Sequence, residues 1–279
     1  MNTMKRLFIF IALAALVLAS CHSGKVKEFK TDTISGEQCY LLIFDEALGP
    51  WGNTVGVTNS YSVVWPDDGM MSRQAKRQLM SLYFGDSTTT DPVKGAKHWL
   101  EQLDYFADDP TCVRKPVESI DDSVVALSYA NLKSYCRQDS NLVTFVVNSE
   151  SYNVGAAHGL YAAQYLTFDV QTGNVVRLSD LVDTSLLGEA IAHAVQDLEV
   201  NRDVRECLFD EFRDVERMPV PRDFFIDSTR STITVVYPLY EVACYACGIQ
   251  SVVLPIFWLS KHTPLTPYAK RLFGPGSSL

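Results

Sequence analysis

The sequence predicts an α+β fold in which antiparallel sheets built from hairpins are covered by a few amphipathic helices. Three observations support this prediction. Short apolar runs rich in β-branched and aromatic residues recur along the chain, turn-forming residues separate them at hairpin distances, and only a few segments have helical periodicity. Sheets joined by short hairpins are antiparallel, so this pattern argues against a doubly wound parallel sheet.

The first half of the chain predicts two strands followed by two helices. Apolar runs at residues 39–44 and 61–65 are separated by a glycine-rich loop, as expected for strands. Apolar residues at helical spacing from Met71 to Leu82 predict a helix that ends at Gly85. A second helix is predicted from Asp91 as its cap and Pro92 at its first position. Its expected apolar face consists of Val93, Ala96, Leu100 and Leu103.

Hairpins dominate the next part of the chain. Residues 123–135 and 141–147 predict a long hairpin, and residues 164–170 and 174–180 predict a tighter one around a Gln-Thr-Gly turn. A helix capped by Ser179 or Thr184 should follow. Its expected buried face consists of Leu187, Ala190, Ile191, Ala194, Val195 and Leu198.

The last predicted elements are a charged segment, a hairpin and a strand. Residues 201–217 are highly charged and predict a solvated helix or loop. Residues 223–228 and 231–238 predict the hairpin, and residues 251–259 predict the closing strand.

These elements suggest two interdependent subdomains, at residues 37–150 and 151–262. Residues 21–36 are polar without periodicity and predict a flexible tether. Residues 263–279 are rich in proline and glycine and predict a weakly ordered tail.

The first residues have the features of a secretory signal peptide. Lys5 and Arg6 precede an apolar run at residues 7–19, which is too short to span a bilayer comfortably. The sequence Leu-Ala-Ser-Cys that ends at Cys21 resembles a bacterial lipobox. We therefore expect residues 1–20 to be removed and Cys21 to carry a lipid anchor with acyl chains such as palmitate. An ordinary signal peptide cleaved near Ser20 is the alternative that this order of features disfavours.

A lipidated Cys21 places the protein on a membrane of the cell envelope. The residues after Cys21 lack the acidic cluster that marks surface export in many Bacteroidetes lipoproteins. This favours the periplasmic side over the cell surface.

The chain is acidic, with 24 Lys and Arg against 33 Asp and Glu, and a net charge of −9. Because Lys5 and Arg6 lie in the signal peptide, the mature part has 22 basic residues (24 − 2) against the same 33 acidic ones. This charge balance disfavours sequence-independent binding to nucleic acid, and we expect no nucleic-acid partner. The excess of acidic residues need not indicate a basic partner, because it also keeps a tethered protein soluble.

The stretch Gly-Ala-Ala-His-Gly at residues 155–159 raises the question of catalysis. A histidine that acts as a general base needs an orienting partner and a group to activate, and Glu241 is the candidate partner for His158. The sequence has neither a Gly-x-Ser-x-Gly elbow nor a His-Glu-x-x-His helix. We therefore favour a structural role for His158, in which it fixes the turn, and assign no catalytic residue.

Six cysteines other than Cys21 permit disulfides outside the cytoplasm, and the sequence does not determine their pairing. Cys244 and Cys247 form a Cys-x-x-Cys pair. A zinc site needs a second pair of ligands, and a thioredoxin-like site should begin a helix after a strand. We favour a local disulfide, two packed thiols or a bond to a distant cysteine, and expect no metal and no cofactor.

Five tyrosines lie close to these motifs in the sequence and suit either recognition of a protein or glycan, or packing at sheet edges. They are Tyr152, Tyr161, Tyr237, Tyr240 and Tyr245.

The second half of the chain resembles a known domain. The features are Gly155, His158 and Gly159, then the segment YLTFDVQTGNVVRLSDLV, then a Tyr-Pro-x-Tyr-Glu segment that contains Tyr237, Tyr240 and Glu241. Their order resembles the C-terminal domain of lysozyme-binding anti-sigma-V factors, also found in envelope lipoproteins of gut Bacteroidetes. The region up to residue 150 is similar to a domain found in a peptidoglycan deacetylase.

The chain departs from this resemblance at several points. Ala156 replaces a glycine of the usual Gly-Gly-Ala-His-Gly loop, which would cost about 1 kcal/mol if that position needs a positive φ. The cysteines at 244 and 247 also lie where the family usually has other residues. The sequence contains no sigma-binding segment and no deacetylase domain, so we expect neither output.

We expect a membrane-anchored binding or sensing module without enzymatic activity. The partners that the resemblance implies are lysozyme-like proteins or cell-wall glycan, besides the bacterial membrane itself. The alternatives are a cell-wall hydrolase or deacetylase that uses His158 and Glu241, and a purely structural envelope component.

Overall fold

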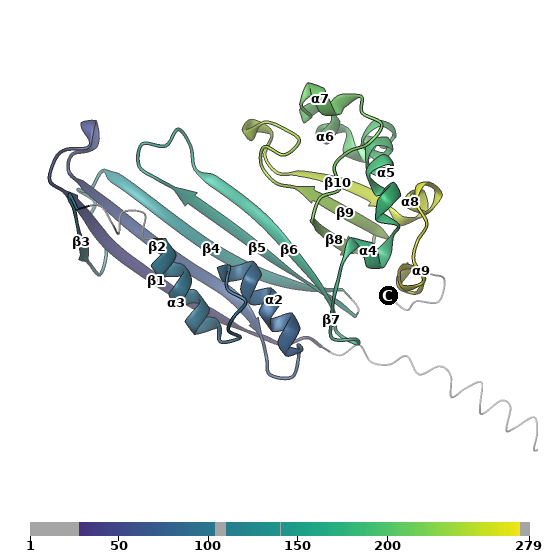
Figure 1. Ribbon diagram of the computed structural model, residues 1–279, viewed down its shortest axis with the longest axis horizontal. Helices are drawn as coiled ribbons and strands as arrows, with labels where there is room; N and C mark the ends of the chain where they lie inside the picture. Colours follow the sequence, from purple (N-terminus) through teal and green to yellow (C-terminus); the bar gives the residue numbers. More distant parts are fainter. Residues whose placement is uncertain (1–27, 104–109, 140, 274–279) are drawn as a thin grey trace, which may run out of the picture.

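The computed structural model describes residues 28–103, 110–139 and 141–273, and it contains two sheets with helices beside them (Figure 1). The predicted α+β class is confirmed. The signal peptide and the lipidated Cys21 lie outside the described residues. None of the helices within these ranges is long and apolar enough to cross a membrane.

The large sheet has seven strands in the order β3-β1-β2-β4-β5-β6-β7. The strands are β1 (Thr31–Phe44), β2 (Thr54–Pro66), β3 (Cys112–Pro116), β4 (Ala126–Asp139), β5 (Leu142–Tyr152), β6 (Leu160–Asp169) and β7 (Asn174–Val176). Its neighbouring strands are antiparallel except for β2 and β4, which are parallel. A parallel pair requires a long crossover, and here the crossover carries two helices and β3.

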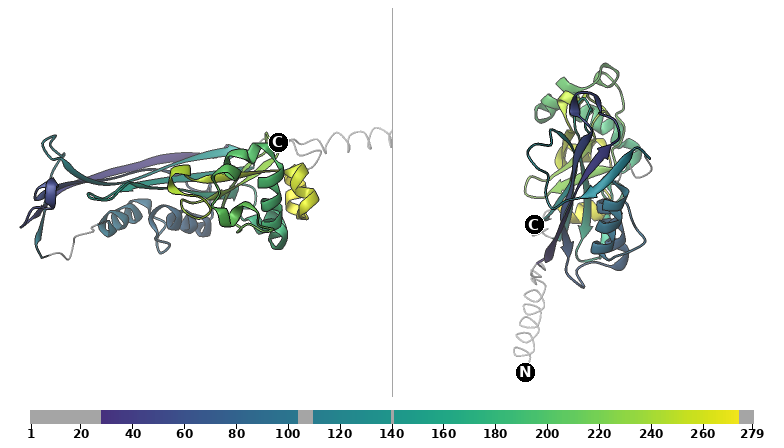
Figure 2. Two further views of the ribbon diagram at one scale, coloured as in Figure 1. Left: turned by 90° about the horizontal axis from the view of Figure 1, so that it is seen from above. Right: turned by 90° about the vertical axis from the view of Figure 1, so that its left-hand side faces the viewer.

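Helices α2 (Arg73–Phe84) and α3 (Pro92–Gln102) lie on one face of the large sheet, as Figure 2 shows. Both were predicted, α2 with Gly85 at its end and α3 with Asp91 and Pro92 at its start. Gly85 ends α2 with a φ of 70°, and the Asp91 carboxylate accepts hydrogen bonds from the backbone of Val93 and Lys94 at the start of α3. The predicted apolar face of α3 is wrong at Val93, which is 60% exposed, whereas Ala96 is buried.

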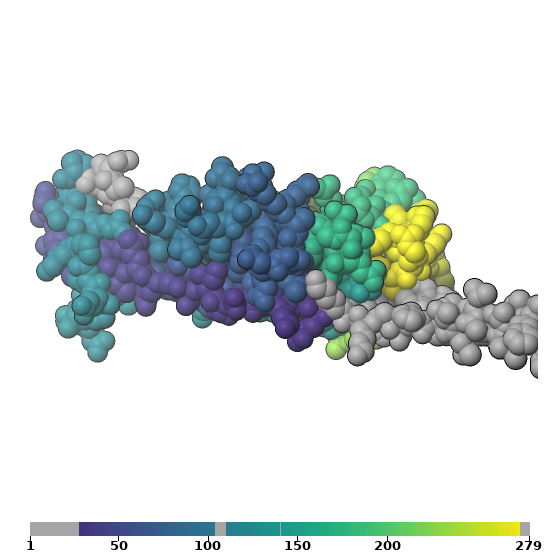
Figure 3. Space-filling model, turned by 90° about the horizontal axis from the view of Figure 1, so that it is seen from below, coloured from purple at the N-terminus to yellow at the C-terminus, as the bar shows by residue number. Residues whose placement is uncertain are grey.

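The core between these helices and the sheet is aromatic and aliphatic. It includes Trp65, Leu79, Met80, Phe84, Phe145 and Phe168. Figure 3 shows the two helices (blue) lying directly beside the C-terminal part of the chain (green to yellow) on the same face of the molecule.

The small sheet has the order β10-β9-β8 and is entirely antiparallel. Its strands are β8 (Asp223–Asp227), β9 (Thr232–Tyr237) and β10 (Gln250–Pro255). Beside it lie α4 (Leu178–Leu181), α5 (Thr184–Asp197), α6 (Arg202–Cys207), α7 (Asp210–Arg213), α8 (Ile256–His262) and α9 (Pro267–Phe273).

Helix α5 packs its apolar face into the core of this C-terminal unit. The predicted residues from Leu187 to Val195 are buried there, but the cap is Asp183 rather than Ser179 or Thr184. The last strand is shorter than the predicted residues 251–259, because α8 begins directly after Pro255.

The predicted boundaries between the parts of the chain need correction. The division at residues 150 and 151 falls within β5, because β6 and β7 complete the large sheet rather than begin a second unit. Residues 31–36 of the predicted tether belong to β1, where they pair with residues 61–66 of β2. The predicted weakly ordered tail contains α9, which buries Ala269 completely.

Candidate functional site

The Gly-Ala-Ala-His-Gly loop joins β5 to β6 and is held by a backbone turn. The Ala156 N–H donates to the Asn153 carbonyl over 2.9 Å, and Gly155 occupies the third turn position with a φ of 86°. Ala156 itself lies outside the left-handed region, so the penalty considered for an alanine there does not arise. The positive φ of the loop falls on Gly155.

His158 has a hydrogen-bond partner at each ring nitrogen. Its Nδ1 lies 2.9 Å from the Gly159 carbonyl, and its Nε2 lies 3.1 Å from the Tyr240 hydroxyl. A carbonyl only accepts, so Nδ1 carries the proton, and in the neutral ring Nε2 accepts from Tyr240. This arrangement ties the loop to the segment after β9, which is the role that we favoured for His158.

Tyr240 and Tyr245 lie against His158, and Tyr161 lies against Tyr245. We call these four residues the aromatic patch: His158, Tyr161, Tyr240 and Tyr245. Tyr245 is its centre. Its ring stacks on His158 with 3.9 Å between centroids, Tyr161 and Tyr240 each lie 5.8 Å away, and its hydroxyl donates to the Gly159 carbonyl over 2.7 Å. Figure 1 shows the β9–β10 loop, which provides Tyr240 and Tyr245, extending from the small sheet toward the large one.

The patch faces solvent. Tyr161 is 38% exposed and Tyr240 is 51% exposed. Tyr240 also has a φ of 66°, in the left-handed region that residues with a Cβ rarely adopt. The backbone is therefore locally strained at the residue whose side chain contacts His158 at the surface.

Tyr237 and Glu241 do not join the aromatic patch. Tyr237 is fully buried in the core of the C-terminal unit, where its hydroxyl donates to the Pro219 carbonyl over 2.7 Å and burial raises its pKa. Among the described residues, no ion pair links Glu241 to His158. Burial and, after it, the nearby charge of Asp223 raise the pKa of Glu241.

The two cysteines of the Cys-x-x-Cys pair lie beside the patch, at either end of the 3-10 helix η3 (Tyr245–Cys247). Both are free thiols, with 3.7 Å between the Sγ atoms. Within the ranges that the structure describes, no three histidine, cysteine or carboxylate side chains gather in an arrangement that could hold a metal ion.

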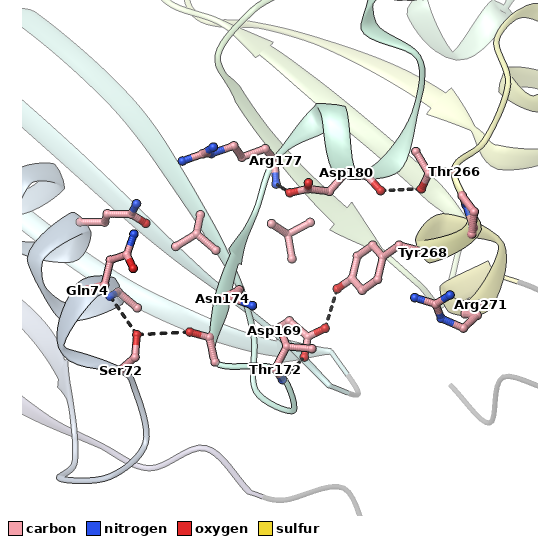
Figure 4. Close-up of a pocket in the computed structure, with 16 residues that line it drawn as sticks. Ser72, Gln74, Asp169, Thr172, Asn174, Arg177, Asp180, Thr266, Tyr268 and Arg271 are labelled. Carbon is pink, nitrogen blue, oxygen red and sulfur yellow. Dashed lines mark hydrogen bonds between the residues drawn. The ribbon is translucent and has the colours of Figure 1, made fainter.

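A cavity of about 670 Å³ lies at the other end of β6 (Figure 4). It is formed by the start of α2, the β6–β7 turn, α4 and α9. Asp169 is its buried acid, whose carboxylate accepts from the backbone of Gln171 and Thr172 and from the Tyr268 hydroxyl over 2.7 Å.

Two arginines give this cavity its cationic groups. Figure 4 shows Arg177 extending toward α2 and Arg271 lying beside Tyr268. Neither arginine forms an ion pair with any residue in the described ranges. The sequence pattern does not indicate this cavity, because α9 contributes Tyr268 and Arg271 from a segment that composition predicts to be weakly ordered.

Comparison with known proteins provides a fold but no activity. No protein-family model matches the sequence, and no curated protein matches it. Two solved structures are similar. One is a DUF3298 family protein from Pseudomonas aeruginosa PAO1, at a TM-score of 0.54 and 14% identity, covering 88% of this chain and 98% of that one. The other is a member of the same family from Bacteroides fragilis NCTC 9343, at a TM-score of 0.57 and 16% identity, covering 88% of this chain and 97% of that one. The chain thus has the fold of bacterial proteins that belong to a family of unknown function.

Proposed function

We propose that this protein is a binding or sensing module of the cell envelope, without enzymatic activity, held at a membrane by a lipid on Cys21. Its recognition surface is the aromatic patch. The observation that carries this proposal is the exposed ring stack, which the fold maintains with a strained backbone at Tyr240. Exposed tyrosines offer apolar area with a polar tip and lose little side-chain entropy on binding.

A protein or glycan of the cell wall is the ligand class that we propose. The faces of tyrosine rings suit sugar rings and protein surfaces alike. The resemblance of the motifs around His158 and Tyr240 to lysozyme-binding anti-sigma-V factors supports a lysozyme-like partner. A basic partner of this kind would be attracted by the net charge of −9, which speeds association at low salt.

The proposal is tested by binding of residues 22–279 to lysozyme and to soluble peptidoglycan fragments, measured by calorimetry and surface plasmon resonance. Truncation of an aromatic residue at the centre of an interface typically weakens binding by tenfold or more. We expect this loss for Tyr161→Ala. Tyr135→Ala is the matched control, because Tyr135 is 53% exposed on β4 and lies outside the patch. Equal affinity of the two variants would refute the patch as the recognition surface.

His158→Ala separates binding from catalysis. Its loss removes one hydrogen bond to Tyr240 and the stack on Tyr245. We expect the variant to bind lysozyme or the peptidoglycan fragments more weakly, while the wild type releases no product from purified cell wall. Turnover by the wild type that His158→Ala abolishes would instead establish the hydrolase or deacetylase alternative.

An association rate that does not change with salt would contradict electrostatic attraction of a basic partner.

A further inference from the structure

Three cysteines meet where the segment after α6 contacts the β9–β10 loop. An isolated bridge pairs Leu208 with Ala243, and the Phe209 N–H donates to the Val242 carbonyl over 2.9 Å. These contacts place Cys207 next to the Cys-x-x-Cys pair. The Sγ of Cys247 lies 3.7 Å from the Sγ of Cys244 and 3.8 Å from the Cys207 carbonyl oxygen.

The thiols of the Cys-x-x-Cys pair differ in environment. Cys244 is exposed, whereas Cys247 is half-buried. Hydrogen bonds with the backbone N–H of Cys247 and with its thiol lower the pKa of Cys244. The pKa of Cys247 is raised to about 12, first by its hydrogen bond with Cys207 and then by burial. An exposed thiol with a lowered pKa, beside a half-buried thiol with a raised pKa, has the asymmetry of a nucleophile and a resolving cysteine.

We propose that Cys244 and Cys247 form a redox-active dithiol that exchanges with a low-molecular-weight disulfide. The Cys244 thiolate attacks one sulfur of the disulfide, so that a mixed disulfide forms and one thiolate leaves. Cys247 then loses its proton and attacks the Sγ of Cys244, and the second thiolate leaves. The two protons of the original thiols end on the two departing thiols. One dithiol and one disulfide thus give the Cys244–Cys247 disulfide and two free thiols.

This reaction also acts on the aromatic patch, an effect that rests on the proposed function. Tyr245 lies between the two cysteines and stacks on His158. A disulfide has an S–S length of about 2.05 Å, so the Sγ atoms must approach from 3.7 Å when the bond forms. Bond formation moves the side chains at the two ends of η3, and this turn carries the central ring of the patch. We infer that oxidation changes how the patch presents Tyr245 to a ligand.

A permanently closed structural disulfide is a weaker explanation. The closed loop would contain only four residues, so the bond would remove little entropy from the unfolded chain. The C-terminal unit also has an extended buried core that holds the segment without a covalent link.

The test is a redox titration of the purified full chain in glutathione buffers, with rapid alkylation and peptide mass spectrometry. We expect one reversible transition that converts two thiols into a disulfide between Cys244 and Cys247. Cys207→Ser should retain this transition, and Cys244→Ser and Cys247→Ser should each lose it. In the reduced protein, Cys244 should react with iodoacetamide faster than the half-buried Cys39 and Cys136. A disulfide that includes Cys207, or the absence of exchange with glutathione, would overturn the proposal.

Coupling to the patch has its own readout. The ring-current shift of the His158 Hε1 proton in NMR spectra should change on oxidation of the wild type and not of Cys247→Ser. An unchanged shift would refute the coupling while the exchange reaction stands. If lysozyme and peptidoglycan fragments bind neither redox form, the proposed function fails independently of the thiol chemistry.

Discussion

Tyr240 shows how much one residue contributes to the aromatic patch. Its backbone is left-handed, its ring is half exposed, and its hydroxyl reaches Nε2 of His158. Non-glycine residues in this conformation pay a local cost that the surrounding structure must offset. The position therefore permits a direct measurement of stored backbone strain.

Comparison of Tyr240→Gly with Tyr240→Ala isolates the strain, because both variants lose the contact to His158. Glycine accepts a φ of 66° without a steric penalty, whereas alanine does not. We expect Tyr240→Gly to have a free energy of unfolding about 1 kcal/mol higher than Tyr240→Ala, even after the entropy that glycine adds to the unfolded chain. Urea unfolding followed by circular dichroism measures the difference.

The same pair of substitutions at Tyr161 is the control. Tyr161 lies in β6 with extended backbone, where alanine should be more stable than glycine. The order at position 240 should be the reverse of this. An identical order at both positions would show that Tyr240 is not strained.

At the residue scale, the sequence identified which residues form the patch but not how their side chains are arranged. It singled out His158, Tyr161, Tyr240 and Tyr245, and the structure brings all four together. The pairing of His158 with Glu241 was wrong, because the choice between adjacent side chains depends on the direction of the backbone. The left-handed φ of Tyr240 sets that direction, and no residue pattern indicates a left-handed tyrosine.

Individual elements differ in how well local sequence specifies them. Helices α2 and α3 have capping residues and apolar periodicity, so the end of α2 at Gly85 and the start of α3 at Asp91 follow from the sequence. The first half of β1 is polar and half-exposed, and its strand conformation comes from pairing with β2. Helix α9 forms from a proline-rich segment because the Tyr268 hydroxyl donates to Asp169 at the end of β6 and Ala269 is buried in the core of the C-terminal unit.

Asn201 connects two elements that local sequence does not link. It is fully buried at the end of the 3-10 helix η2 (Glu199–Asn201). Its Nδ2 donates to the carbonyls of Ala194 in α5 and Val253 in β10, each over 3.0 Å, and its Oδ1 accepts from the Val253 N–H over 2.8 Å. This single amide therefore satisfies three backbone groups.

Asn201→Ala should lower the free energy of unfolding by about 3 kcal/mol, because it leaves buried backbone groups without partners. Asn201→Asp should cost at least as much at neutral pH, since it opposes a carboxylate oxygen to two carbonyl oxygens. Chemical denaturation measures both. Glu199→Ala, at an exposed neighbouring position, should change the value by less than about 0.5 kcal/mol. Equal effects at the two positions would contradict the bridging role of Asn201.

At the scale of the whole molecule, β6 and β8 join the two sheets. The Tyr165 N–H of β6 donates to the Asp223 carboxylate of β8 over 2.8 Å, and the rings of Tyr165 and Phe225 stack at 5.4 Å. Near the other end of β8, the Asp139 carboxylate of β4 accepts from the Ser228 N–H over 2.7 Å. These contacts make the two subdomains interdependent, although their boundary differs from the predicted one.

Asp223 gives this junction a pH dependence. Burial raises its pKa above the ordinary value of 3.8, although hydrogen bonding to Tyr165 opposes the shift. Below pH 3.8 the acid is protonated in both folded and unfolded chains, so it costs no stability. Between the two pKa values, Asp223 ionises more readily in the unfolded chain than in the folded one. The free energy of unfolding therefore decreases as the pH rises through the folded-state pKa.

Asp223→Asn keeps the acceptor for Tyr165 and cannot ionise. We expect its free energy of unfolding, relative to wild type, to increase from pH 4 to pH 7. Loss of the Asp223 charge also lowers the pKa of Glu241, which acts in the same direction. Urea unfolding across this range measures the trend. Asp86→Asn should show the opposite trend, mostly below pH 4, because hydrogen bonds to Thr88 lower the pKa of Asp86 and wild-type stability from this group is lost as the pH falls. A parallel trend in the two variants would contradict the assignment.

The parallel pairing of β2 with β4 has a consequence for how the chain folds. Val55 pairs with Ala126, which is 71 positions later (126 − 55), whereas the β1–β2 hairpin and the β4 to β7 meander form from neighbouring segments. Closing a loop of this length costs entropy before any contact compensates for it. The two strand groups can therefore form early and separately. We expect their union along β2 and β4 to be the late, slow event that limits the rate at which the large sheet becomes continuous.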